Sequence, residues 1–286
     1  MLKRTLAALC GLWLALPVPA LDIDIYNPGE ESTFPVSSVL VTGEREALLI
    51  DAQFQRNDAE NLVRKIRASG RTLTTIYISH QDPDYYFGLD VLHAAFPDAR
   101  ILATPQTVAG IQASAEGKLA YWGPVLGELA PRELIVPEPL DGDHLLLEGE
   151  RLEVRGLDGP TPARTYVWIP SQRTIAGGVL VFGNMHVWLA DTQSRASRRH
   201  WRAALQGMRA LSPVTVVPGH FLPGAPLTEA SVAFTDAYLE TVEEALPKAR
   251  NAAELIEAVQ ARYTALKGAD TLALSAKVLT GEMDWP

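Results

Sequence analysis

The pattern of apolar and polar positions along the first third of the chain predicts strands that are interspersed with helices. The helical pattern is clearest over residues 58–68, where apolar side chains recur at helical spacing before Ser69 and Gly70 end the run. A second helix is predicted over 89–96. Strands are predicted over 22–26, 36–42, 47–51, 74–78 and 100–103. This order of elements is typical of an α/β layered fold.

The second half of the chain continues the alternation and closes with helices. Residues 105–131 have a mixed apolar pattern that predicts one or two amphipathic helices. Further strands are predicted over 134–140, 145–148, 151–156, 166–170, 174–182 and 212–217, and further helices over 198–211, 234–246 and 252–266. No Pro/Ser-rich linker or charge block interrupts the chain, so we expect residues 21–286 to form a single domain.

Residues 1–20 have the pattern of a secretory signal peptide. Lys3 and Arg4 precede the apolar run 6–16, and small residues at 18–20 form a cleavage site before Leu21. The apolar run is shorter than the roughly 20 residues that span a bilayer. We therefore expect an exported protein, periplasmic or secreted, with no stable membrane insertion.

Composition removes several classes of function. The chain has 34 acidic and 25 basic side chains and a formal charge of -9, which argues against nucleic acid as a partner. The one cysteine, Cys10, lies in the predicted signal peptide. The mature chain is therefore expected to lack disulfides, thiolate nucleophiles and cysteine zinc sites. A small-molecule substrate is the expected partner, and the sequence does not indicate an oligomeric state.

Two strand ends carry candidate metal ligands. The predicted strand at 74–78 leads into His80, Asp82 and Asp84, a donor set that suits Zn²⁺, Mn²⁺ or Fe²⁺. The same residues also fit a polar turn in which an aspartate caps a helix starting near Tyr86. Farther along, a Val-rich strand ends in a tight turn at His220.

Taken together, these stretches resemble the metallo-β-lactamase fold superfamily, whose motif is a strand followed by H-x-H-x-D-H and a glycine. His80 matches the first histidine, Asp84 the aspartate and Gly88 the glycine, and His220 stands in the family's Val-Pro-Gly-His setting. The resemblance covers roughly residues 35–221. It implies a four-layer αββα sandwich and hydrolysis by metal-activated water.

The sequence departs from the family pattern at four positions. Asp82 and Tyr85 replace two motif histidines, Pro160 aligns with a loop histidine, and Val179 aligns with the acid that bridges two metals. The resemblance thus implies His80 and Asp82 as ligands in one half of the site, and Asp84 and His220 in the other. Because the bridging acid is missing, we expect one ion, Zn²⁺ first, with Fe or Mn as alternatives.

Other residues are assigned supporting roles by the same resemblance. Asp84 or Asp158 would accept a proton from water, and Asp158 is the one nearby side chain able to replace the missing histidine. Asp51 would brace the metal loop through hydrogen bonds, although a strand-end cap is the alternative. His186, in a His-x-Trp-Leu-Ala-Asp run, would support the ligands or belong to the core.

Three functions follow from these assignments. The first is an exported metal-dependent hydrolase of a small ester, lactone, amide or related substrate. The second is a catalytically degenerate protein that binds a metal or ligand on the same fold. The third is a di-iron redox or oxygen-binding protein, because some members of the resembled superfamily carry a carboxylate in place of the second histidine. The sequence does not identify the substrate.

Overall fold

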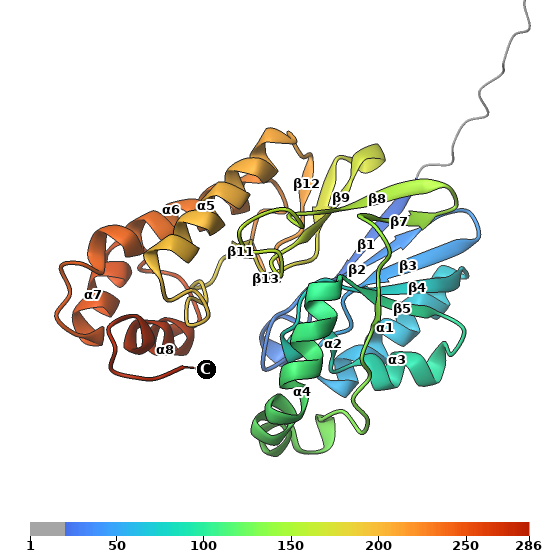
Figure 1. Cartoon of the computed structure of the whole chain (residues 1–286), viewed down its shortest axis with the longest axis horizontal. Coiled ribbons are helices and arrows are strands. Elements are labelled where there is room, and N and C mark those ends of the chain that lie inside the picture. Colours follow the sequence, from blue (N-terminus) through green and yellow to red (C-terminus); the bar gives the residue numbers. More distant parts are fainter. Residues whose placement is uncertain (1–20, 286) are drawn as a thin grey trace, which may run out of the picture.

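The computed structural model describes residues 21–285, so the predicted signal peptide at residues 1–20 lies outside the described residues. Two sheets face each other (Figure 1). The first has six strands in sequence order: β1 Asp22–Tyr26, β2 Ser38–Thr42, β3 Glu46–Ile50, β4 Thr72–Ile78, β5 Arg100–Ala103 and β6 Glu138–Pro139. Strands β1 to β3 pair antiparallel and β3 to β6 pair parallel. The parallel strands bring their carboxyl ends to one edge of the sheet.

The second sheet has five strands in the order β12-β10-β9-β8-β7. Its members are β7 His144–Leu147, β8 Glu150–Arg155, β9 Tyr166–Ile169, β10 Thr174–Ala176 and β12 Thr215–Val216. A separate parallel pair joins β11 Phe182–Gly183 to β13 His220–Phe221. This pairing places His220 beside Phe182 and carries the imidazole to the edge where β4 ends.

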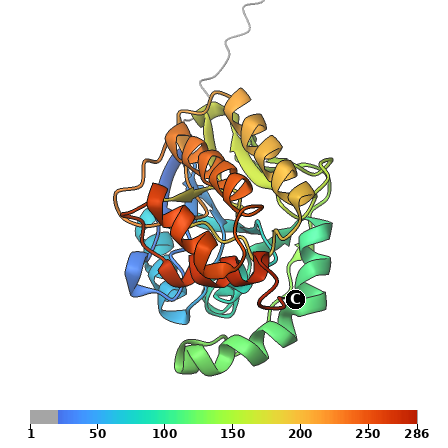
Figure 2. The same cartoon turned by 90° about the vertical axis from the view of Figure 1, so that its left-hand side faces the viewer.

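Helices cover the outer faces of both sheets (Figures 1 and 2). Their bounds are α1 Arg56–Ser69, α2 Pro83–Tyr86, α3 Leu89–Ala95, α4 Pro105–Leu126, α5 Arg195–Ala210, α6 Glu229–Ala245, α7 Ala252–Arg262 and α8 Ala269–Leu279, with 3-10 turns at Gly29–Glu31, Gly127–Leu129 and Pro170–Gln172. Helix α1 buries Leu62 and Ile66 in the cluster that contains Ile76 of β4. Helix α5 buries Trp201 and Leu205 in the same cluster. The predicted four-layer αββα sandwich is confirmed.

A second apolar cluster fills the space between the two sheets. The first sheet contributes alternate positions such as Val39 and Val41, and the second contributes Leu145, Leu147 and Val167. Alternation follows from the strand period of two, which turns every second side chain toward the partner sheet. The two sheets are thereby held face to face, and their edges carry the loops.

Several predicted elements have different bounds in the structure. The strand expected over 134–140 is reduced to Glu138–Pro139, and the run 174–182 is split into β10 and β11. Gly177 and Gly178, with φ of 70° and 77°, turn the chain between these two strands. Residues 105–131 contain one long helix despite Pro124. Helix α8 was not predicted. No helix among residues 21–285 is long and apolar enough to cross a membrane.

Candidate functional site

Asp51 joins three segments at the edge of the first sheet. It follows β3 with φ of 65°, a left-handed conformation that aspartate tolerates better than most residues. Its carboxylate accepts hydrogen bonds from the backbone N–H of Ser79 at 2.8 Å and from Ser79 Oγ at 2.8 and 2.7 Å. Ser79 Oγ in turn accepts from the N–H of Gly178 at 2.7 Å. Burial raises the pKa of Asp51 to about 7, although the Ser79 hydrogen bonds oppose the increase.

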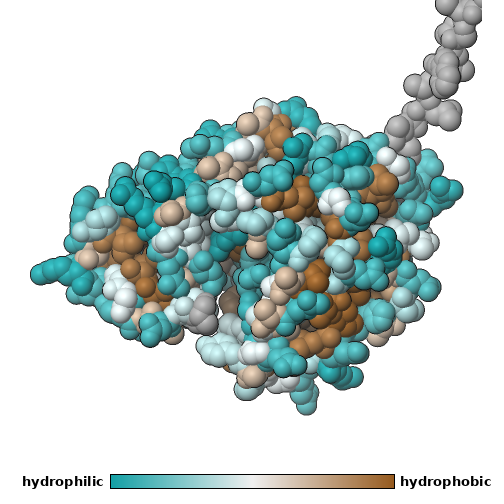
Figure 3. All heavy atoms as spheres, in the orientation of Figure 1, coloured by the Kyte–Doolittle hydropathy of each residue, from teal (hydrophilic) through white to brown (hydrophobic). Residues whose placement is uncertain are grey.

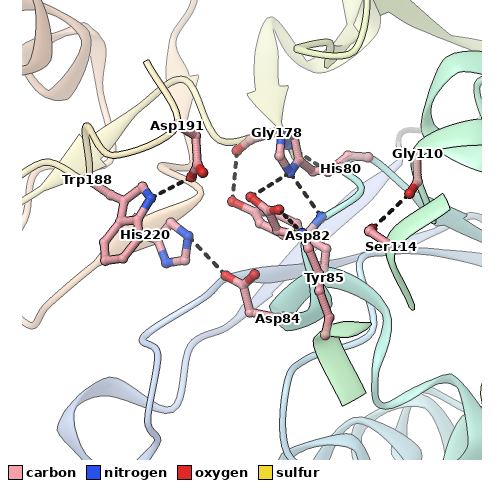
Figure 4. A network of polar contacts seen from close by, with 12 residues as sticks. His80, Asp82, Asp84, Tyr85, Gly110, Ser114, Gly178, Trp188, Asp191 and His220 are labelled. Carbon is pink, nitrogen blue, oxygen red and sulfur yellow. Dashed lines mark hydrogen bonds and ion pairs between the residues drawn. The ribbon is translucent and has the colours of Figure 1, made fainter. Parts of the chain in front are cut away.

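Tyr85 lies between the two candidate histidines. Pro83 begins the single-turn helix α2, which turns Tyr85 inward, and its side chain is fully buried. Its ring centroid is 5.3 Å from that of His80 and 5.7 Å from that of His220 (Figure 4). Burial raises the pKa of Tyr85 well above 10, so the phenol is neutral. The structure therefore brings the two strand ends together around this ring.

Asp84 and His220 form one buried pair in the site. Asp84 Oδ2 lies 3.2 Å from His220 Nε2. The imidazole also stacks on Phe182, with ring centroids 5.2 Å apart. Gly219 allows this approach, because a Cβ there would lie 2.1 Å from the carbonyl oxygen of Gly178. The tight turn that the sequence predicted before His220 thus requires glycine at position 219.

His80 and Asp82 form a second pair that also engages a lysine. His80 Nδ1 accepts a hydrogen bond from the backbone N–H of Asp82 at 3.2 Å and lies 3.3 Å from Asp82 Oδ2. The other carboxylate oxygen, Oδ1, accepts a hydrogen bond from Lys118 Nζ. Burial alone would raise the pKa of Asp82, but His80 and Lys118 overcome it and hold the pKa well below the ordinary value. Asp82 is therefore an anion that is paired with Lys118.

Helix α4 delivers Lys118 to the loop. Thr104 caps the helix by accepting from the N–H of Thr107 at 3.1 Å. Gly110 faces the loop so closely that a Cβ there would lie 1.9 Å from Gln81 Oε1. Lys118 lies eight residues after Gly110 and so falls on the same helical face. Figure 4 shows Gly110 and Ser114 beside the Asp82 loop.

A second cation, Arg164, precedes Thr165, whose hydroxyl donates to the carbonyl oxygen of Ser79 at 3.5 Å, next to His80. Its guanidinium carbon is 5.2 Å from the centre of the Trp201 ring. Burial lowers the pKa of Arg164, while Asp191 and Asp82 act against that decrease. Asp191 itself accepts hydrogen bonds from the indole N–H groups of Trp188 at 2.5 Å and Trp285 at 2.7 Å. The surface is hollowed between the C-terminal helices and the part that contains α4 (Figure 3).

Two predicted site residues do not contact the others. Asp158 is exposed on the turn that follows β8, and no hydrogen bond or ion pair within residues 21–285 links its side chain to the site. His186 is buried and its Nδ1 lies 2.9 Å from Tyr238 Oη, in contact with helix α6. Burial lowers the pKa of His186. The core interpretation that the sequence left open fits this position.

Lys118 and Arg164 were not identified from the sequence. Both belong to segments whose approach to His80 depends on the tertiary fold. The apolar pattern over 105–131 is mixed, so it does not mark the helix face on which Lys118 lies. Nothing in the loop before β9 singles out Arg164. Basic residues in helices and loops are usually solvated, so neither position was informative in isolation.

Comparisons with known proteins agree on the fold. The family model described as the metallo-beta-lactamase superfamily matches residues 32–220, well over half of the chain. A metallo-beta-lactamase family protein from Thermus thermophilus superposes with a TM-score of 0.63 at 18% identity, over 92% of this chain and 93% of that chain.

Two metallo-beta-lactamases give similar superpositions. The DIM-1 enzyme, in a crystal exposed to ceftazidime, has a TM-score of 0.58 at 21% identity and covers 78% of this chain and 98% of its own. The enzyme from Pontibacter korlensis has a TM-score of 0.57 at 19% identity over 77% and 95%. No curated protein matches the chain at a significant level.

Members of this superfamily usually bind divalent metal ions, and the donors present fit such an ion only in part. Two ligands that share a tetrahedral Zn²⁺ at about 2.0–2.1 Å lie about 3.3 Å apart. The 3.2 Å between Asp84 and His220 fits that spacing. Asp82 is occupied by Lys118, and His80 Nδ1 by the loop backbone. No group of three His, Cys, Asp or Glu side chains within residues 21–285 is arranged to hold an ion.

Proposed function

The chain belongs to the metallo-β-lactamase superfamily, and from that premise we propose that it is a hydrolase that uses one divalent ion at Asp84 and His220. Zn²⁺ is the first choice, with Fe and Mn as alternatives. The observation that carries the proposal is the 3.2 Å separation of Asp84 Oδ2 and His220 Nε2. Two protein ligands leave the remaining positions to water or substrate, and they imply weaker binding than the usual three. At superfamily level the fold is consistent with metal-dependent hydrolysis.

The residues around this pair would prepare the site for hydrolysis. When bound, the ion would supply Lewis-acid chemistry, by lowering the pKa of water and polarising an acyl or phosphoryl oxygen. Asp84 is the one carboxylate at this pair and would accept the proton of the attacking water. Phe182 and Tyr85 hold the His220 ring from two sides, and the neutral Tyr85 phenol adds no competing charge. Asp51 and Ser79 fix the strand end from which the loop starts.

We propose small esters and lactones as the first substrates to examine, with amides and β-lactams after them. The fold does not determine the substrate. The relatives named as β-lactamases share at most 21% identity with this chain, so their substrate does not transfer by likeness alone. Because the site lacks a third protein ligand, we expect weak metal binding, so the assay buffer should contain free metal.

The test is a hydrolysis screen of these substrates with metal-free and Zn²⁺-supplemented protein. We expect activity that depends on added metal and falls at least a hundredfold in Asp84→Asn and His220→Ala. Asp158→Asn serves as a matched acidic control and should keep the activity. Hydrolysis that persists in Asp84→Asn would contradict the role of this pair. A stable, folded protein without metal or hydrolysis would favour the degenerate binding protein instead.

We also propose that the protein is exported, on the pattern of residues 1–20. The support is the basic pair Lys3 and Arg4 followed by an apolar run and a small-residue cleavage site. Intact mass of the protein from the periplasm or medium tests this. The expected mass corresponds to a chain starting at Leu21, and a chain that retains residues 1–20 would contradict export by this route.

A further inference from the structure

Lys118 occupies the half of the site where the superfamily pattern would place a metal ligand set. Its ammonium contacts Asp82 Oδ1, and Asp82 also adjoins His80. The position is determined by packing, because the helix is docked on the loop at Gly110 and anchored one turn after Lys118 by Trp122. Trp122 packs edge-on against Phe34 and Phe54, with ring centroids 5.2 and 5.6 Å apart. The helix thereby holds Lys118 beside Asp82 in this half of the site.

Lys118 keeps donors that the protein does not use. An ammonium group has three N–H donors, and within residues 21–285 its one hydrogen-bond acceptor is Asp82. Its side chain retains 26% exposure, so the lysine is accessible from solvent. A cation that is partly desolvated and only partly hydrogen-bonded favours an additional anionic acceptor.

Arg164 presents a similar imbalance near the same loop, because its neighbour Thr165 contacts the carbonyl oxygen of Ser79 at 3.5 Å. The carboxylates that raise the pKa of Arg164 are Asp191 and Asp82. Both already have other hydrogen-bond or ion-pair partners. The two tryptophan indoles hold Asp191, and Lys118 with His80 holds Asp82. No side-chain hydrogen bond or ion pair joins the Arg164 guanidinium to another residue in the described part of the chain. Its planar donors suit a carboxylate or phosphate.

We propose that Lys118 takes the place of a metal cation at His80 and Asp82, and that Lys118 and Arg164 together bind a small anion, a carboxylate or phosphate group. This deepens the proposed function by naming the substrate class, namely an ester, lactone or amide that carries such a group. The anion would lie beside Asp82, held by the two cations, with the Asp84 and His220 pair facing the bond to be cleaved. The anion site itself requires no bound metal.

The test is isothermal titration calorimetry of inorganic phosphate and of succinate into protein freed of metal with EDTA. We expect wild type to bind at least one of them, and the preference between the two distinguishes phosphate from carboxylate recognition. Lys118→Met and Arg164→Gln should each weaken binding at least tenfold. Lys267→Met is the matched control, because Lys267 is an exposed cation paired with Glu30, and it should bind as wild type does. Lys118→Arg and Arg164→Lys keep the charge and should restore part of the affinity.

Thermal midpoints of all variants establish that each one is folded. If Lys118→Met or Arg164→Gln unfolds, the test relies on the neutral variant at the other position and on the charge-keeping variants Lys118→Arg and Arg164→Lys. No heat of binding in folded wild type with either anion would overturn the proposal. Wild-type affinity in both Lys118→Met and Arg164→Gln would overturn it as well. Anion binding without metal uptake or hydrolysis would contradict the hydrolase proposal and the substrate class, but it would support the anion site, so the two failures are distinguishable.

Discussion

Asp84 and His220 are 136 residues apart in the sequence, and the fold brings Asp84 Oδ2 to 3.2 Å from His220 Nε2. One of them follows β4 of the first sheet and the other begins β13 beside the second sheet. The contact therefore depends on the two sheets being packed face to face. The corresponding pair at His80 and Asp82 is already occupied by the ammonium of Lys118. The two halves of the site therefore differ in which carboxylate is already paired with a lysine.

Replacing Asp51 should reduce stability according to the side chain that takes its place. Asp51→Ala removes the acceptor for the buried Ser79 donors and leaves alanine at φ of 65°. We expect a loss of about 2–4 kcal/mol in the free energy of unfolding. Asp51→Asn keeps one acceptor oxygen and tolerates that backbone, so we expect about 1 kcal/mol. Urea denaturation measures both, and equal losses would argue against this role for the carboxylate.

Two glycines of helix α4 offer a matched comparison. A Cβ at Gly110 would meet the Gln81 side chain at 1.9 Å, whereas a Cβ at Gly117 meets nothing within 4 Å. Gly117→Ala should stabilise the protein by about 0.5–1 kcal/mol, because alanine is the better helix former. Gly110→Ala should lose that benefit, displace Gln81 and shift Lys118. Thermal melts of the two variants test this, and a comparable stabilisation in both would show that the helix does not press on the loop.

His186 should make stability depend on pH in the weakly acidic range. Burial lowers its pKa from 6.5, so below pH 6.5 the unfolded chain binds more protons than the folded one. The contribution of this group is fully present above pH 6.5 and is lost as pH falls through the folded-state pKa. Each unit of pKa difference is worth about 1.4 kcal/mol. Chemical denaturation between pH 5 and 8 should show a shallower decline in His186→Gln than in wild type, and identical profiles would contradict the assignment.

The fold was largely predictable because strand and helix periods are local properties of the sequence. The spacing of apolar residues before His80 predicts a strand, and the spacing after Asp58 predicts a helix. The structure has β4 and α1 at these positions. The long run 174–182 was misjudged, since the effect of Gly177 and Gly178 depends on a close approach. A Cβ at Gly178 would lie 2.1 Å from the carbonyl oxygen of Thr165, 13 residues earlier in the chain.

The sequence predicted only those candidate site residues that belong to a recognisable motif. His80, Asp84 and His220 were selected as candidates because each follows a strand in a recognisable setting, and the structure brings them together around Tyr85. Asp158 was chosen by its nearness in sequence to the missing histidine, and its turn leaves it exposed. The approach of Lys118 depends on how α4 docks, and that docking is decided by packing among Phe34, Phe54 and Trp122.

The most direct measurement of the central claim is the metal stoichiometry of purified protein at equilibrium with free Zn²⁺. The protein is dialysed against buffer that contains a fixed Zn²⁺ concentration, and the metal in excess of that buffer is measured by inductively coupled plasma mass spectrometry. With one pair free and the other occupied by Lys118, wild type should hold about one equivalent. Asp84→Asn and His220→Ala should hold none, while Asp158→Asn should match wild type. Two equivalents in wild type, or one equivalent retained in both Asp84→Asn and His220→Ala, would contradict the account.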